Sequence, residues 1–148
     1  MDSDDISAVL GSTDIFRGLR PRVLRRLAQA GRVVQTPPGA EVIRAGESVS
    51  GFHAHSPLHM HVILAGDATV RINGQDVERL AVDDYFGDLA LIDEQPRSAD
   101  VVAGESGLTT WSLGKGGFDK VVEEHPEVLL PMIKVVVARL RRAEAAAG

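Results

Sequence analysis

The stretch YFGDLALIDEQPRSADVV, residues 85–102, brings a glycine, a carboxylate, an apolar run and an arginine close together in sequence. Gly87 permits a backbone turn that a side chain would obstruct, and Asp88 follows it directly. Arg97 returns after the apolar run and a polar turn. If the apolar run forms one helical turn, its amides and the arginine can bind an anion together. The stretch therefore predicts a phosphate cradle with a carboxylate beside it.

The carboxylate restricts which phosphate compound fits this cradle. Asp88 would repel a bare phosphate, so it is better explained as an acceptor for hydroxyl donors such as a ribose 2′-OH. A phosphodiester carries one negative charge, which Arg97 alone can neutralise. The chemistry that these residues require is a phosphate fused to a sugar. The alternative is an ordinary surface salt bridge between the two side chains, which contributes little to stability.

Composition and charge narrow the class of protein. The chain has 148 residues, of which 44% are hydrophobic, so we expect one domain over residues 1–148 with one well-buried core. The net charge of −5 disfavours nucleic acid as a partner. The absence of cysteine excludes disulfides and fits a reducing cytosol. No signal-peptide pattern and no apolar run of about 18 residues is visible, so we expect a cytoplasmic chain without membrane contact.

Helical patterns lie at the two ends of the chain. Residues 1–31 carry helix-like apolar spacing, with Pro21 suited to a first turn and Gly31 to a stop. Helix returns over residues 117–148, where a broad apolar stripe is interrupted by two prolines. We therefore expect a helical lead-in and, after the middle of the chain, a short helix followed by a longer one.

The middle of the chain, residues 32–116, has a β pattern. It consists of short β-type runs, among them HVILA (residues 61–65), ATVRI (68–72), ADVVA (99–103) and LTTWSL (108–113). Turn signals rich in glycine and proline separate these runs. Many short strands with closely spaced turns are typical of a sandwich or a barrel.

Within this layout, residues 85–99 resemble the phosphate-binding cassette of the cyclic nucleotide-binding domain family. The family pattern is Phe-Gly-Glu-hydrophobic-Ala-Leu, a variable turn, then Pro-Arg-small-Ala. The flanks are similar too: residues 14–31 resemble the family's helical entry, and residues 108–133 its last strand and hinge helix. The resemblance implies a mainly β fold, an eight-stranded antiparallel β-roll (a jelly roll) with an N-terminal helical lead-in and C-terminal hinge and lid helices.

Residue by residue, the resemblance implies that Arg97 pairs with the cyclic phosphate and that Asp88 accepts from the ribose 2′-OH. Ser98 stands where a hydroxyl can reach the phosphate or the purine. Asp88 departs from the family's usual Glu and is shorter by one methylene. The residues implied to frame these side chains are Gly87, Leu89, Ala90 and Ala99.

The resemblance implies a sensor rather than an enzyme, with cyclic AMP as the favoured ligand, cyclic GMP as the alternative and no required cofactor. No nucleophile-elbow pattern is visible in the sequence. The ligand is expected to favour closure of the C-terminal helix over the purine, and an effector outside this chain to respond to that helix, which is also a candidate homodimer surface. An apolar pocket would leave the extra polar edge of guanine unpaired. The expected base pocket and lid are Val62, Val70, Ile133, Val136, Val137 and Leu140.

A histidine-rich segment, residues 48–60, supports a different hypothesis. His53, His55 and His59, together with Gly66 downstream, resemble the first metal motif of cupins, which are also β-rolls. Two histidines one residue apart on a strand point to the same face, as metal ligands must. The competing explanation is an inserted polar loop, because no second cupin motif follows. A third alternative is a degenerate module that binds no nucleotide and serves as an interaction domain.

Overall fold

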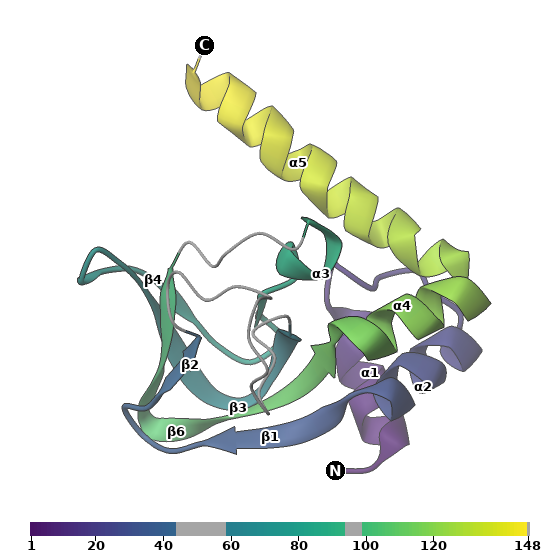
Figure 1. The fold of residues 1–148 in the computed structure, drawn as a ribbon, viewed down its shortest axis with the longest axis horizontal. Coiled ribbons are helices and arrows are strands. Elements are labelled where there is room, and N and C mark those ends of the chain that lie inside the picture. The colour runs from purple at the N-terminus through teal and green to yellow at the C-terminus, as the bar shows by residue number, and fades with distance from the viewer. Residues whose placement is uncertain (44–58, 94–98, 148) are drawn as a thin grey trace.

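The computed structural model describes residues 1–43, 59–93 and 99–147. In Figure 1, helices α1, α2 and α4 gather at one end of a curled sheet, while α5 runs away from the body. The helices are α1 (Ser3–Ser12), α2 (Pro21–Ala30), α3 (Ala90–Asp93), α4 (Lys115–Glu124), the 3-10 turn η1 (Pro126–Val128) and α5 (Leu129–Ala147). The strands are β1 (Arg32–Thr36), β2 (Glu41–Ile43), β3 (His59–Ile72), β4 (Gln75–Leu80), β5 (Tyr85–Phe86) and β6 (Asp100–Gly114).

Local sequence accounts for where the first two helices begin and end. Asp2 caps α1, because its side chain accepts from the backbone N–H of Asp5 at 2.9 Å. Pro21 occupies the first turn of α2, where its missing N–H costs nothing, and Gly31 follows the last residue of α2. The two helices pack against each other at one end of the sheet (Figure 1).

The sheet is antiparallel throughout its described part, in the order β1-β6-β3-β4, with β2 pairing β6 and β5 pairing β3. The expected fold class, mainly antiparallel β with flanking helices, is confirmed. The structure describes six strands, because runs that the sequence pattern separates are continuous here. Gly66 and Gly107, both with a φ of 80°, let β3 and β6 bend together without breaking.

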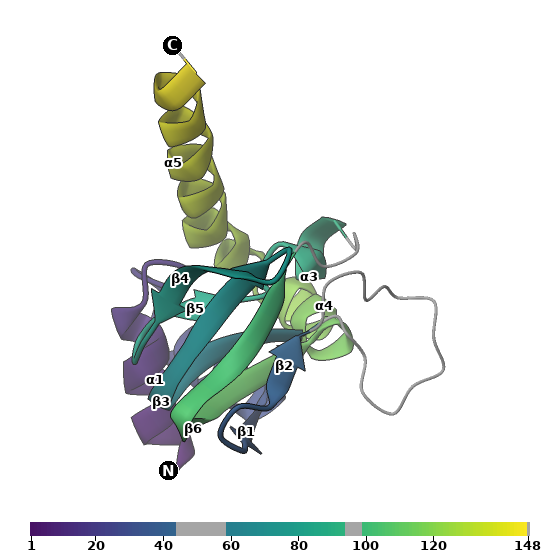
Figure 2. The same ribbon diagram turned by 90° about the vertical axis from the view of Figure 1, so that its left-hand side faces the viewer.

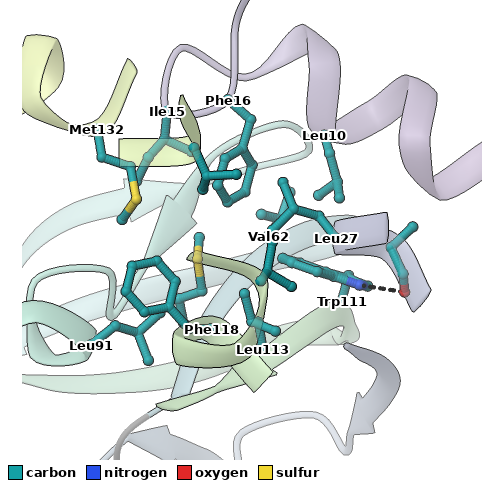
Figure 3. Packing of buried hydrophobic residues seen from close by; sticks show 14 of the residues in the cluster. Leu10, Ile15, Phe16, Leu27, Val62, Leu91, Trp111, Leu113, Phe118 and Met132 are labelled. Atoms are coloured by element: carbon teal, nitrogen blue, oxygen red, sulfur yellow. Dashed lines mark hydrogen bonds between the residues drawn. The ribbon is translucent and has the colours of Figure 1, made fainter. Parts of the chain in front are cut away.

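Two clusters of buried apolar side chains hold the fold together. The helical core lies between the helices and the sheet, and Trp111 is its largest fully buried side chain. Trp111 meets Phe16 edge to face at 6.2 Å between ring centroids, and its indole N–H donates to the carbonyl of Ala28 at 3.2 Å (Figure 3). The roll core lies inside the curl of the sheet and contains Ile43, Ile63, Ala68, Leu80, Phe86, Val101, Ala103 and Leu108.

Helix α5 has two unequal halves. Its first half packs on the helical core through Pro131, Met132 and Val135. Among residues 136–147, which the structure describes in full, every residue is exposed except Arg139. Within the described parts of the chain, no helix is long and apolar enough to cross a membrane.

Candidate functional site

The predicted phosphate-binding stretch begins as a tight turn between β5 and α3. Gly87 has a φ of 82°, a conformation that favours glycine, so the chain reverses direction directly after β5. The N–H of Leu91 donates to the carbonyl of Asp88 at 3.2 Å, which closes the first turn of α3. Leu91 is fully buried in the helical core and anchors this turn to the body. The short helical turn expected for the apolar run is present.

Asp88 lies almost wholly inside the protein, with 6% of its surface exposed. A carboxylate at that depth requires hydrogen bonds or a counter-ion. Arg139 of α5 supplies one: its Nη1 donates to Asp88 Oδ2 at 3.1 Å. Within the part of the chain that the structure describes, Oδ1 accepts no hydrogen bond. Among the described residues, one oxygen of this buried carboxylate is therefore held and the other has no donor.

Arg139 itself rests on an aromatic ring. Its guanidinium carbon lies 5.9 Å from the ring centroid of Tyr85, a cation–π contact, and the Tyr85 hydroxyl donates to Asp14 Oδ1 at 2.5 Å. Burial lowers the pKa of Arg139, but the charge of Asp88 and the contacts with Tyr85 and Asp88 outweigh it and raise that pKa. Burial first, and then the hydrogen bond to Asp14, raise the pKa of Tyr85 above its ordinary value.

The other residues expected to frame the phosphate occupy different depths. Ala90 is buried, Ala99 is half-buried, and Leu89 is exposed beside Asp88. Arg97 and Ser98, expected at the phosphate, lie outside the described residues, so their roles stay predictions. The described part of the stretch places Gly87, Asp88 and Ala90 at one turn.

The two strand residues expected in the base pocket lie in different cores. Val62 pairs with Tyr85 and Trp111 in the sheet and is fully buried in the helical core (Figure 3). It has no surface left with which to touch a base. Val70 packs, partly buried, against the roll core. The register shifts around Gly66 separate the two valines, and simple alternation along a strand does not reveal such shifts.

The residues expected to form the lid share one exposed helix face. Ile133 is 54% exposed and Leu140 is 57% exposed, and Val136 and Val137 are also exposed. Figure 1 shows α5 passing above α3. The stripe is thus on the helix that reaches Asp88, although the stripe residues themselves cover nothing among the described residues.

The histidine hypothesis receives no support from the described residues. His53 and His55 lie outside them. His59 begins β3 and its Nδ1 lies 3.0 Å from Ser112 Oγ, while His61 stacks on Phe86 and its Nδ1 lies 2.9 Å from Thr110 Oγ1. Over residues 1–43, 59–93 and 99–147, no group of three or more His, Asp or Glu side chains is placed to hold a metal.

Sequence reasoning missed three members of this site: Arg139, Tyr85 and Asp14. The sequence pattern assigned none of the three a role in the site. Arg139 and Asp88 are 51 residues apart, and no local rule links them. The available signal is weak: a single arginine precedes the last apolar residue of the stripe.

Comparison with known proteins identifies the family pattern over most of the chain. A family model described as "Cyclic nucleotide-binding domain" matches residues 33–125. A cGMP-dependent protein kinase of Eimeria tenella is 30% identical over 141 residues, which are 95% of this chain and 13% of that protein. A cAMP-dependent protein kinase regulatory subunit of Aspergillus niger is 28% identical over 117 residues, 78% of this chain and 26% of that protein. The chain therefore spans a minor part of these relatives.

Solved structures share the fold at lower sequence identity. The N-terminal domain of a transcriptional regulator from Streptomyces coelicolor A3(2) superposes with a TM-score of 0.75 at 21% identity, covering 93% of this chain and 96% of that one. The regulatory domain of Toxoplasma gondii PKA, crystallised with cAMP, superposes with a TM-score of 0.73 at 24% identity, covering 92% and 50%. These matches agree with the antiparallel roll and flanking helices described above.

Proposed function

We propose that this chain, which belongs to the cyclic nucleotide-binding domain family, is a cytoplasmic cyclic AMP sensor whose helix α5 moves when nucleotide binds. The observation that carries the proposal is Asp88: a carboxylate with 6% exposure, on a glycine turn, with one oxygen held and one without a donor among the described residues. A neutral hydroxyl of a sugar satisfies such an oxygen, whereas a second anion would be repelled.

In this proposal the ligand is held at two points. Asp88 Oδ1 accepts the ribose 2′-OH, and Oδ2 stays with Arg139, so this contact is the point about which the exposed stripe of α5 turns toward the purine. Arg97, from the same stretch of sequence, neutralises the single charge of the cyclic phosphate through a bidentate pair. Ser98 adds a hydroxyl at the phosphate or the purine. In this proposal the chain makes and breaks no covalent bond of its ligand. It binds the cyclic nucleotide and releases it unchanged.

Base selection is assigned to apolar surface. Val70 is partly buried beside the roll core, and the exposed stripe of α5 offers isoleucine, valine and leucine. Neither surface can pair the extra polar edge of guanine, whose burial then costs about 1–3 kcal/mol for each unpaired group. We therefore assign cyclic AMP as the preferred ligand. The relatives named above include proteins named for either nucleotide, so their names do not decide the base.

The stripe on α5 also provides the output. A stripe that is exposed in one position of α5 and covers the purine in another is available to a partner in only one of the two. Nucleotide and partner are then coupled, and each changes the affinity of the other by the same factor. We assign as partner an effector segment outside this chain or a second copy of α5. Relatives several times longer than this chain have room for such a segment.

A competition titration of cyclic AMP against cyclic GMP tests the base assignment. On the full chain we expect cyclic AMP to bind about tenfold more tightly than cyclic GMP. This factor lies in the lower half of the range of affinity loss that one or two unpaired polar groups of guanine would cause. Ile133→Ser with Val137→Ser should shrink this ratio, because the substitutions remove apolar cover without touching the cores. Val77→Ser, at an exposed valine on β4, is the control and should leave the ratio unchanged. A ratio that favours cyclic GMP, or one that the two stripe substitutions leave unchanged, would refute the assignment of cyclic AMP as the preferred ligand.

A further inference from the structure

Four side chains from four separate segments form one continuous polar chain. Asp14 lies between α1 and α2, Tyr85 in β5, Asp88 before α3 and Arg139 in α5. The Tyr85 hydroxyl donates to Asp14, the Tyr85 ring carries the guanidinium of Arg139, and Arg139 donates to Asp88. We call this set the Tyr85 chain. It connects the N-terminal helices to the carboxylate assigned to the ribose.

The Tyr85 chain fixes the outer half of α5. After Val135, Arg139 is the one residue of α5 that is not exposed, and its side chain is 35% exposed. The apolar residues around it, Val136, Val137 and Leu140, are exposed and belong to neither core. The position of this half of the helix therefore depends on where Arg139 is held.

Arg139 has a defined position because it is held at two places. Its Nη1 meets Oδ2 of Asp88 at 3.1 Å, and the ring of Tyr85 supports its guanidinium. The ring is in turn fixed by the hydrogen bond of its hydroxyl to Asp14 and by its partial burial against the helical core. An aromatic ring that is fixed at both ends positions a flexible arginine better than solvent does.

We propose that Tyr85 is a positioning residue: anchored by Asp14, it holds Arg139 so that Arg139 fixes both α5 and the Asp88 carboxylate. The ribose end of the site is then coupled, through Tyr85 and Arg139, to the loop between α1 and α2 that carries Asp14. This inference rests on the proposed function for its ligand, although the coupling itself needs no nucleotide.

A double-mutant cycle with two ligands tests the proposal. We expect Arg139→Gln to weaken cyclic AMP binding about tenfold and Asp14→Ala about threefold, with the double variant no weaker than Arg139→Gln alone, since both act through one path. Both substitutions should weaken binding of 2′-deoxy cyclic AMP less than binding of cyclic AMP, because the 2′-deoxy ligand lacks the hydroxyl that Asp88 accepts and keeps only its contact with α5. Arg142→Gln and Asp5→Ala, which make the same charge changes at exposed positions, are the controls.

Tyr85→Phe separates the hydroxyl from the ring and guards against misfolding of a harsher variant. It keeps the platform under Arg139 but removes the bond to Asp14, so its effect should equal that of Asp14→Ala and disappear in the Asp14→Ala background. Additive losses, or equal losses with the 2′-deoxy ligand, would overturn the proposal.

A measurement without nucleotide keeps this proposal distinct from the proposed function. The chain has one tryptophan and no cysteine, so Glu144→Cys takes a single acceptor dye for energy transfer from Trp111 in the core to α5. Arg139→Gln, Asp14→Ala and Tyr85→Phe should each broaden the distance distribution, whereas Arg142→Gln should not. If the chain binds no cyclic nucleotide but the distance distributions broaden as expected, the proposed function fails and the Tyr85 chain stands. If the distributions are unchanged, the proposed role of the Tyr85 chain is overturned.

Discussion

Asp88 illustrates how burial and charge are reconciled at a single residue. An ionised carboxylate with 6% exposure is costly unless charged or polar partners compensate it. The sequence motif predicted the carboxylate and its turn, because glycine followed by an acid before an apolar run is a local pattern. It could not predict Arg139, because that contact depends on the direction in which α5 leaves the body. The burial of Asp88 therefore depends on the fold, whereas the presence of a carboxylate at this position can be recognised from the sequence motif.

Tyr85 is the only tyrosine of the chain, which makes its ionisation measurable by ultraviolet absorbance. Burial, the hydrogen bond to Asp14 and the charge of Asp14 raise its pKa well above the ordinary value of 10.0, and Arg139 partly opposes them. In the folded protein we expect little tyrosinate absorbance at about pH 11, where an unfolded chain is largely ionised. Asp14→Ala should lower the pKa and Arg139→Gln should raise it.

The same shift has a defined sign for stability. Because the folded pKa of Tyr85 lies above the unfolded one, its contribution to folding is fully present below about pH 10 and is lost as the pH rises beyond it. Tyr85→Phe should therefore remove an alkaline loss of stability that wild type shows. A native tyrosinate midpoint near the ordinary value would mean that the hydroxyl is free of Asp14.

At the scale of elements, the junction between α2 and β1 depends on a missing side chain. A Cβ placed on Gly31 would lie 2.5 Å from ring atoms of Trp111 and 2.7 Å from the carbonyl oxygen of Ser112. The Trp111 ring is fully buried and held by its bond to Ala28, so it cannot move aside cheaply. Gly31 therefore ends α2 and, because it has no side chain, also leaves the space that the Trp111 ring occupies.

Gly31→Ala should accordingly destabilise the protein by about 1–3 kcal/mol, the usual cost of overpacking. Urea unfolding followed by Trp111 fluorescence measures this change. Gly116→Ala, in α4 with open space around its Cβ, is the matched control and should stabilise by about 0.5–1 kcal/mol, as alanine does in a helix. Stabilisation by both substitutions would show that the α2–β1 junction has room to relax.

The sequence pattern predicted the kinds of elements better than their connections. Helices over the ends and strands in the middle follow from local periodicity, and the structure has α2 ending at Ala30 and β1 beginning at Arg32. The runs HVILA and ATVRI are one strand, β3, because Gly66 bends the chain against Gly107 instead of turning it back. Whether a glycine bends or reverses a strand depends on which residue lies beside it in the sheet. The sequence pattern does not reveal that pairing.

At the scale of the whole molecule, the residues proposed for binding come from the middle of the chain and the helix proposed for output comes from its C-terminal end. The lead-in loop, the turn before α3 and α5 meet at the Tyr85 chain, although they are far apart in sequence. Figure 2 shows α5 standing clear of the body beyond this meeting point. In the proposed function, a domain built in this way converts a small change at Asp88 into a displacement of a long helix. The family match and the arrangement of α5 thus support the same proposed role, a ligand-controlled helix.

Titration calorimetry of cyclic AMP into the full chain and into Arg97→Ala tests the proposed function. We expect one binding site on the wild type and a loss of about 2–5 kcal/mol of binding free energy in the variant, since one charged hydrogen-bonded pair is removed. Trp111 fluorescence should be the same in both, and Arg142→Ala should bind like the wild type. An Arg97→Ala protein that binds cyclic AMP as tightly as the wild type, or a wild type that binds neither cyclic nucleotide, would show that this domain is not a cyclic nucleotide sensor of the proposed kind.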